Sequence, residues 1–126
     1  MAIGIVTLNL GWDVSYRIEN FTAGGVFRPG AVVSFPGGKG VNVARVLRQL
    51  GEAPRLLGCI DASTGIRVQE GLRSEGISLF PVPISGALRT CIHILDPVRS
   101  RQTVINEPGP RFSVAEHERI RAAFRT

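Results

Sequence analysis

The sequence predicts an α/β protein in which a partial parallel sheet carries helices and a small antiparallel sheet is inserted as a separate layer. Three observations lead to this prediction. Short apolar runs alternate with segments of helical periodicity, as in parallel sheets with right-handed crossovers. Two hairpin-like segments interrupt that alternation, and together they can form one small sheet. The composition, with 44% hydrophobic and 20% charged residues over 126 positions, is that of a globular domain with one core.

Two apolar runs, Ile3–Leu8 and Arg55–Ile60, and a short strand near Ile77–Pro83 are expected to form the parallel strands. The first interruption covers about residues 14–35, where two loosely alternating runs flank Gly24–Gly25. The second covers about residues 88–106, where Arg89–Leu95 and Gln102–Ile105 flank a turn at Asp96–Arg101. We expect these two hairpins to form the inserted sheet.

Three helices are expected between and after these strands. The first follows the glycine-rich break at residues 36–38 and carries an apolar stripe of Val43, Val46, Leu47 and Leu50, with Gly51 as its stop. The second begins with Ser63 or Thr64 as its cap, runs through about Glu75 and ends at Gly76. Ser113 and Glu116 have the spacing of a capping box for the third.

Composition also restricts the location and the ligands. No apolar run approaches the roughly 20 residues that a membrane span needs, and the N-terminal residues lack the basic flank of a signal peptide. Cys59 and Cys91 are not in CxxC spacing, so we expect two buried thiols rather than a disulfide or a metal site. These features predict a cytoplasmic protein that has no membrane partner and binds no metal through this chain.

The net charge of +5 raises the question of a nucleic-acid partner. The arginines are dispersed between Arg17 and Arg125, and few aromatic residues are present to stack on bases. We therefore predict no nucleic-acid binding. A phosphorylated small molecule would also be attracted by this charge.

The segment from Pro36 to Asn42, PGGKGVN, is the strongest candidate for a ligand-binding loop. Glycines at a strand-to-helix junction allow close approach of a ligand, and the N–H groups of the helix start favour an anionic or polar one. A Walker A loop is excluded, because Val33 stands where its first glycine belongs and Gly40 follows Lys39. A dinucleotide fingerprint is also absent. Taken alone, the glycines could equally serve close helix packing.

The wider pattern resembles the PfkB family of carbohydrate kinases. The run PGGKGVNVARVLRQLG is similar to the N-terminal signature of that family, and Thr7-Leu8-Asn9 followed by Asp13 is similar to its first motif. Arg89-Thr90 and the run NEPGP at residues 106–110 resemble the branch of 1-phosphofructokinases and tagatose-6-phosphate kinases. These segments occur in the family's order along almost the whole chain.

The resemblance implies a ribokinase-like fold, an inserted lid and ATP-dependent phosphorylation of a phosphosugar. It places Asp13 on sugar hydroxyls, which suits a carboxylate that only accepts hydrogen bonds. It implies that Gly38, Lys39 and Asn42 line the same pocket, and that Arg89 holds the phosphate through its planar set of donors. Glu107 falls in the loop on the ligand side, without a clear role.

Two departures from the family pattern limit what the resemblance implies. Leu10, Gly11 and Trp12 replace the usual proline, small and aliphatic residues, and Trp12 could narrow the pocket or stack on a sugar. The GAGD-like motif that carries the family's catalytic aspartate is absent. We therefore expect residues 1–126 to be the N-terminal part of a truncated kinase that is inactive alone and contains no catalytic residue.

Binding of ATP and Mg²⁺ is expected only in a full-length parent. The acceptor could be fructose-1-phosphate, fructose-6-phosphate or tagatose-6-phosphate, and the sequence does not distinguish among them. The alternative function is a non-catalytic module that binds sugar phosphates or dimerises through the lid.

Overall fold

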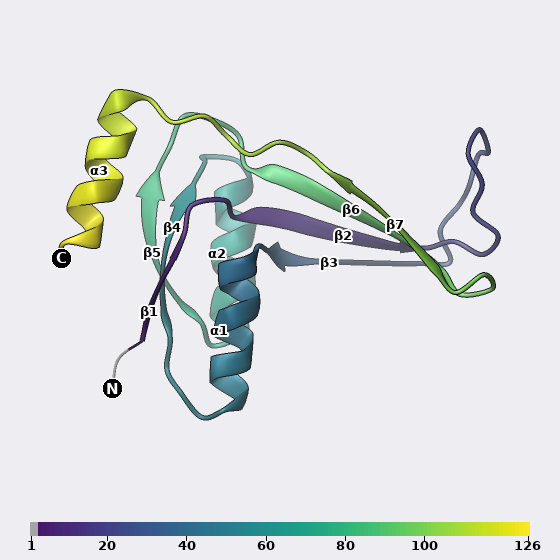
Figure 1. The fold of residues 1–126 in the computed structure, drawn as a ribbon, viewed down its shortest axis with the longest axis horizontal. Helices are drawn as coiled ribbons and strands as arrows, with labels where there is room; N and C mark the ends of the chain where they lie inside the picture. The colour runs from purple at the N-terminus through teal and green to yellow at the C-terminus, as the bar shows by residue number, and fades with distance from the viewer. Residues whose placement is uncertain (1–2) are drawn as a thin grey trace.

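Two sheets of different pairing organise the chain in the computed structural model, which describes residues 3–126 (Figure 1). In chain order the elements are β1 Gly4–Thr7, β2 Gly11–Arg17, β3 Ala31–Gly37, α1 Lys39–Gln49, β4 Arg55–Ile60, α2 Thr64–Ser74, β5 Ser78–Pro83, β6 Arg89–Asp96, β7 Arg101–Asn106 and α3 Val114–Phe124. The predicted strands and helices are all present, with boundaries shifted by a few residues.

The first sheet is parallel throughout, in the order β1-β4-β5. Helices α1 and α2 cover one of its faces and α3 covers the other, so this part of the molecule has three layers (Figure 1). We call these three strands and three helices the body. The body confirms the prediction of a parallel α/β sheet, in which helices cover both faces of the strands.

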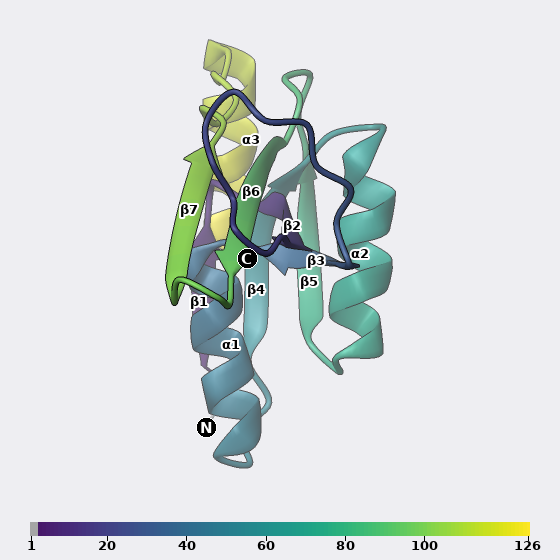
Figure 2. The ribbon, with the colours of Figure 1, turned by 90° about the vertical axis from the view of Figure 1, so that its right-hand side faces the viewer.

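The second sheet, in the order β3-β2-β6-β7, projects from one end of the body, and we call it the lid (Figures 1 and 2). Its outer pairs β2·β3 and β6·β7 are antiparallel, as predicted, but its central pair β2·β6 is parallel. The sheet is therefore mixed rather than wholly antiparallel. The reason is that β2 and β6 leave the body in the same direction, each as the first strand of its hairpin.

The first hairpin differs from its prediction in another respect. Residues 18–30 form a long connection between β2 and β3, whereas we expected the two strands to be joined by a glycine turn at Gly24–Gly25. Gly24, with a φ of 81°, and Asn20, with a φ of 56°, both lie within this loop. Asp96 stabilises the loop, because its carboxylate accepts N–H groups from Asn20 and Phe21 at 3.0 Å each.

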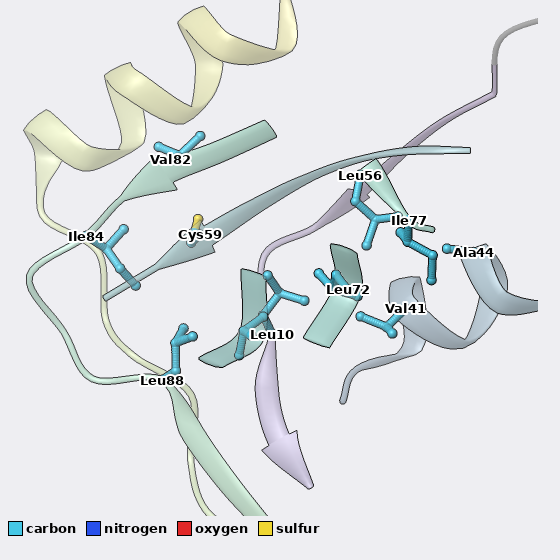
Figure 3. Packing of buried hydrophobic residues seen from close by; sticks show 11 residues of the cluster. Leu10, Val41, Ala44, Leu56, Cys59, Leu72, Ile77, Val82, Ile84 and Leu88 are labelled. Atoms are coloured by element: carbon cyan, nitrogen blue, oxygen red, sulfur yellow. The ribbon is translucent and has the colours of Figure 1, made fainter. Parts of the chain in front are cut away.

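The core lies between the body sheet and its helices, and it also includes the segments that lead into the lid (Figure 3). Its fully buried side chains include Leu10, Leu56, Val68 and Leu72. Both cysteines are buried and free, as predicted. Among residues 3–126, no helix is long and apolar enough to cross a bilayer.

The apolar stripe predicted for α1 is not the face that packs against the sheet. Val41 and Ala44 are fully buried there, while Val43, Val46 and Leu50 are 50%, 54% and 72% exposed. Position relative to the sheet decides this, because the start of α1 is fixed by the glycines against β1. Val41 and Ala44 then face the sheet, and Val43 and Val46 face outward although they are no larger than Val41.

Two predicted helix caps differ in the hydrogen bonds that their side chains make. Ser113 and Glu116 form the predicted capping box at α3. Ser63 is the N-cap of α2 but makes no side-chain cap hydrogen bond. Asp61 supplies it instead, since its Oδ1 accepts the N–H of Gly65 at 2.7 Å. A buried carboxylate before a helix start is favoured there by the helix dipole.

Candidate functional site

The predicted site residues gather where the body meets the lid. Thr7 ends β1, and the chain passes through Asn9 into β2. The glycine-rich segment ends β3 and begins α1 beside this crossing. Arg89 begins β6, directly opposite Gly11 of β2 in the parallel register. Three chain segments that are distant in sequence therefore bring Asp13, the glycines and Arg89 to one place.

The glycines of the loop have different structural roles. Gly38 has a φ of 123°, a conformation that side chains rarely adopt, and a Cβ there would lie 3.3 Å from the carbonyl oxygen of Asn9. A Cβ on Gly40 would lie 2.5 Å from Cβ of Thr7, so Gly40 allows α1 to pack on β1. A Cβ on Gly37 would collide with the carboxylate of Asp13. Helix packing and ligand access thus both depend on this segment.

The carboxylate of Asp13 lies between the bare backbone of Gly37 and the imidazole of His93. Oδ2 is 3.8 Å from Nε2 of His93, and the Asp13 side chain is 19% exposed. Among the described residues, no N–H or O–H group donates to it, and its hydrogen-bond partner is the thiol of Cys91, a weak donor. A half-buried carboxylate with free acceptor capacity is a good site for hydroxyl groups.

Arg89 is a cation without an ionic partner among residues 3–126. No carboxylate lies within 4 Å of its guanidinium, and its Nε is the one buried side-chain nitrogen or oxygen of the described chain that has no hydrogen-bond partner. The side chain lies against Gly11, where a Cβ would be 3.0 Å from its Cγ. Burial raises the pKa of the neighbouring Cys91 thiol, and the positive charge of Arg89 opposes that rise.

Asn42 and Lys39 extend the site along the first turn of α1. Oδ1 of Asn42 accepts a hydrogen bond from Arg45 at 3.1 Å, which leaves its amide N–H groups available. Arg45 also donates to the carbonyl of Pro36 at 2.8 Å. Lys39 is exposed and makes no side-chain hydrogen bond or ion pair within the part of the chain that is described.

The sequence interpretation missed Arg45, which holds this corner together. Its Nε donates to Glu75 on α2 at 2.6 Å, and its guanidinium lies 5.4 Å from the centre of the Phe35 ring. The hydrogen bond to Glu75 raises the pKa of Arg45. Because Arg45 is not part of the apolar stripe predicted for this helix, it resembled an ordinary surface residue. Only its distance to Glu75, 30 residues away, reveals the role.

Glu107 and Trp12 lie in positions that the sequence could not determine. Glu107 is exposed, and its Oε2 accepts the N–H of Thr90 at 2.8 Å, which extends the pairing of β6 and β7. Trp12 points to the opposite face of the lid from Asp13, because neighbouring side chains alternate along a strand. It packs toward α2, with the guanidinium of Arg67 4.9 Å from its ring centre. Trp12 therefore does not face the carboxylate of Asp13.

Comparison with known proteins identifies the family. Residues 1–122 match the model of the pfkB family carbohydrate kinases. The chain belongs to this family of sugar kinases, as its sequence motifs predicted.

Solved structures agree with this assignment. A structure described as a possible 1-phosphofructokinase from Thermotoga maritima superimposes with a TM-score of 0.90 at 29% identity, over 98% of this chain and 40% of that one. Phosphofructokinase-2 from Escherichia coli in complex with fructose-6-phosphate gives a TM-score of 0.90 at 24% identity, over 97% and 40% of the two chains. At that identity the second likeness shows the fold alone. The chain thus spans about two fifths of the length of these structures, and its fold is a partial ribokinase-like one.

Proposed function

We propose that this chain is the acceptor-binding part of an ATP-dependent phosphosugar kinase of the cytoplasm. Its ligand is a phosphorylated ketohexose, such as fructose-1-phosphate, fructose-6-phosphate or tagatose-6-phosphate. In this proposal Asp13 accepts sugar hydroxyls, and Gly38, Lys39 and Asn42 provide backbone and side-chain donors beside it. Glu107 holds the start of β6 through Thr90, next to the phosphate-binding position.

The observation that carries the proposal is the unpaired Arg89 close to Asp13. A buried guanidinium nitrogen without a partner is costly in a folded protein, and such groups often have a ligand. Phosphate oxygens match the donor geometry of arginine. Asp13 and Arg89 together provide an acceptor for hydroxyls and a donor for phosphate, which is the polarity of a phosphosugar.

ATP and Mg²⁺ fit the described residues poorly. No group of three or more His, Cys, Asp or Glu side chains among residues 3–126 is arranged to hold a metal ion. The buried carboxylates Asp61, Asp96 and Glu116 are each engaged by backbone N–H groups. We therefore assign nucleotide and metal binding to the remainder of a full-length parent.

The proposal of a longer parent also has support at the edge of the body sheet. Within the described chain β1 pairs only with β4, so its other side presents unpaired backbone groups. On the α3 side of the same sheet lies a groove of about 360 Å³ whose lining includes Val6, Phe80 and Phe124, and these three side chains are exposed. A further strand would pair with β1, and its helix would cover this groove.

The test is a calorimetric titration of the chain with the three sugar phosphates, with the free sugars and with ATP. We expect one sugar phosphate to bind, with the free sugar and ATP giving no comparable heat. Arg89→Ala should weaken binding of the sugar phosphate by about tenfold or more, since a charge-assisted hydrogen bond contributes about 1.5–3 kcal/mol.

Arg55→Ala is the matched control, because Arg55 is an exposed arginine at the opposite end of β4 from the site. It should leave the affinity unchanged. Equal affinity of the wild-type and Arg89→Ala chains would contradict the phosphate assignment. No binding of any sugar phosphate by the folded chain would contradict the proposed function as a whole.

A second function, as a module that dimerises through the lid, is favoured by the surface of the lid. Val32, Val33, Val104 and Ile105 are exposed on its outer strands β3 and β7. Exposed apolar side chains on a sheet often mark a contact between proteins. Light scattering of the isolated chain distinguishes the two cases, because a monomer that binds sugar phosphate supports the first function without the second.

A further inference from the structure

His93 faces the same side of the lid as Asp13. In the parallel register of β2 and β6, Asp13 pairs with Cys91 and Ser15 pairs with His93, so all four side chains lie on one face. The imidazole Nε2 is 3.8 Å from Oδ2 of Asp13, and the two side chains are 23% and 19% exposed. Both groups are therefore accessible to a small ligand from the same side.

A third residue, Gln102, contacts the other ring nitrogen of His93. Nε2 of Gln102, on β7, lies 3.0 Å from Nδ1 of His93. An amide nitrogen only donates hydrogen bonds, so Nδ1 is the acceptor in this contact. In the neutral ring the single hydrogen must then be on Nε2, the nitrogen that faces Asp13.

The separation of 3.8 Å is too long for a direct hydrogen bond but suits a bridging group. A hydroxyl oxygen placed about 2.8 Å from each atom would lie beside the line that joins them, on their common exposed side. A hydroxyl can donate to the carboxylate and accept from the imidazole at the same time. A ketone, an ether or a fluorine at that place could accept from His93 but could not donate to Asp13.

We propose that His93 is a further ligand-binding residue of this chain, and that His93 and Asp13 hold one and the same sugar hydroxyl. His93 donates through Nε2–H, Asp13 accepts, and Gln102 is a positioning residue that selects the tautomer. The role in sugar binding rests on the proposed function, whereas the tautomer does not. The pair makes the site selective for a hydroxyl over any group that can only accept.

The tautomer is tested first, by long-range ¹⁵N–¹H NMR of the ligand-free chain at a pH where both histidines are neutral. The chain has two histidines, and His117 is the internal reference. Its Nδ1 lies 3.0 Å from the carbonyl oxygen of Ser113, which can only accept, so its hydrogen is on Nδ1. We expect opposite tautomers for the two rings. The same tautomer in both would overturn the proposal.

A substitution at Gln102 provides a second test of the same contact. Gln102→Glu replaces the donor with an acceptor on an exposed residue, so the fold should be unaffected. His93 should then carry a hydrogen on Nδ1, while the spectrum of His117 stays as it was. An unchanged His93 spectrum would show that Gln102 does not select the tautomer.

The bridge is tested by calorimetric titration with the sugar phosphate that the wild-type chain binds. His93→Leu should weaken binding about five- to tenfold, the effect of one lost hydrogen bond. His93→Gln should recover most of it, because the glutamine amide nitrogen can donate from the region of Nε2. His117→Gln is the control and should bind like the wild type. Gln102→Leu, on the exposed strand β7, should lower the affinity for the sugar phosphate by a smaller factor. This variant takes the place of His93→Leu in the test if His93→Leu does not fold.

The outcomes separate the two proposals. Wild-type affinity in His93→Leu or Gln102→Leu, with Asp13→Ala impaired, would overturn the bridge and leave the proposed function standing. No binding by the wild-type chain would overturn the proposed function and the bridge together. A deoxy analogue that loses affinity in the wild type, but no further affinity in His93→Leu, would identify the bridged hydroxyl.

Discussion

The body and the lid bury their side chains to very different extents. The body contributes most of the continuous apolar cluster, with Leu56, Val68 and Leu72 fully buried. In the lid, every residue of β7 is exposed, and β3 is exposed from Ala31 to Ser34. Most of the folding free energy must therefore come from the body, since apolar burial is its main favourable contribution. The candidate ligand-binding residues lie at the base of the lid, the less stable of the two parts.

Two buried aspartates show the same contrast with matched chemistry. Asp61, in the body, accepts N–H groups of Gly65 and Leu88 at 2.7 Å and 2.9 Å and so joins α2 to the start of β6. Asp96, in the lid, accepts N–H groups of Asn20 and Phe21. In both, burial disfavours the charge, but these N–H groups hold the pKa of the carboxyl below its usual value. One carboxylate organises the body, and the other ties together the far end of the lid.

The largest expected effect on stability comes from truncating a buried side chain in the core of the body. Leu72→Ala should lower the free energy of unfolding by about 2–5 kcal/mol, because Leu72 is fully buried and leaves a cavity. Val104→Ala, on an exposed lid strand, should change it by less than about 0.5 kcal/mol. Urea denaturation followed by circular dichroism measures both. Similar losses in the two variants would mean that the lid shares the stability of the body.

The next prediction concerns Gly37, at the border of the two parts. Gly37→Ala places a Cβ against the carboxylate of Asp13, so the carboxylate must move and sugar phosphate affinity should fall about ten- to a hundredfold. Gly4→Ala is the control, because nothing lies within 4 Å of its added Cβ. Calorimetric titration gives the affinities. Unchanged binding in Gly37→Ala would exclude Asp13 from the binding site.

The two aspartates allow a finer comparison. Asp61→Ala should lower the free energy of unfolding by about 1–3 kcal/mol, the cost of leaving buried N–H groups without an acceptor. Asp96→Ala should instead increase amide hydrogen exchange at Asn20, Phe21 and Arg99, with a smaller change in global stability. Hydrogen exchange measured by NMR distinguishes local opening of the lid from global unfolding. A global loss in Asp96→Ala as large as in Asp61→Ala would show that lid and body unfold together.

The smallest expected effect is a pH dependence within the body. Backbone N–H groups of Ser113 and Ser85 lower the pKa of Glu116 to about 2. A carboxyl whose pKa is lower in the folded state stabilises fully above its unfolded value, about 4.3, and loses this contribution as pH falls toward 2. Urea midpoints between pH 7 and pH 3 should therefore fall less steeply for Glu116→Gln than for the wild type. If the urea midpoints of the two proteins fall equally steeply with pH, Glu116 does not contribute to the acid sensitivity of the fold.

Local patterns in the sequence were enough to predict the elements of the fold and the family. Alternation of apolar runs and helical periodicity predicted the parallel body, and β4 matches its predicted range, Arg55–Ile60. The capping box at Ser113 was also predictable, because its partners are three residues apart. Motif spacing identified Asp13, the glycine segment and Arg89 as candidates, and their roles in binding stay predictions.

Contacts between distant segments were decided only by the tertiary structure. The parallel pairing of β2 and β6 joins hairpins about 80 residues apart, and no local pattern encodes it. The same holds for Arg45 with Glu75 and for the cap that Asp61, rather than Ser63, provides to α2. The exposed Val43 and Val46 show why a local pattern does not predict such contacts. Periodicity predicts that a helix has an apolar face, but only its packing against the sheet determines which face is buried.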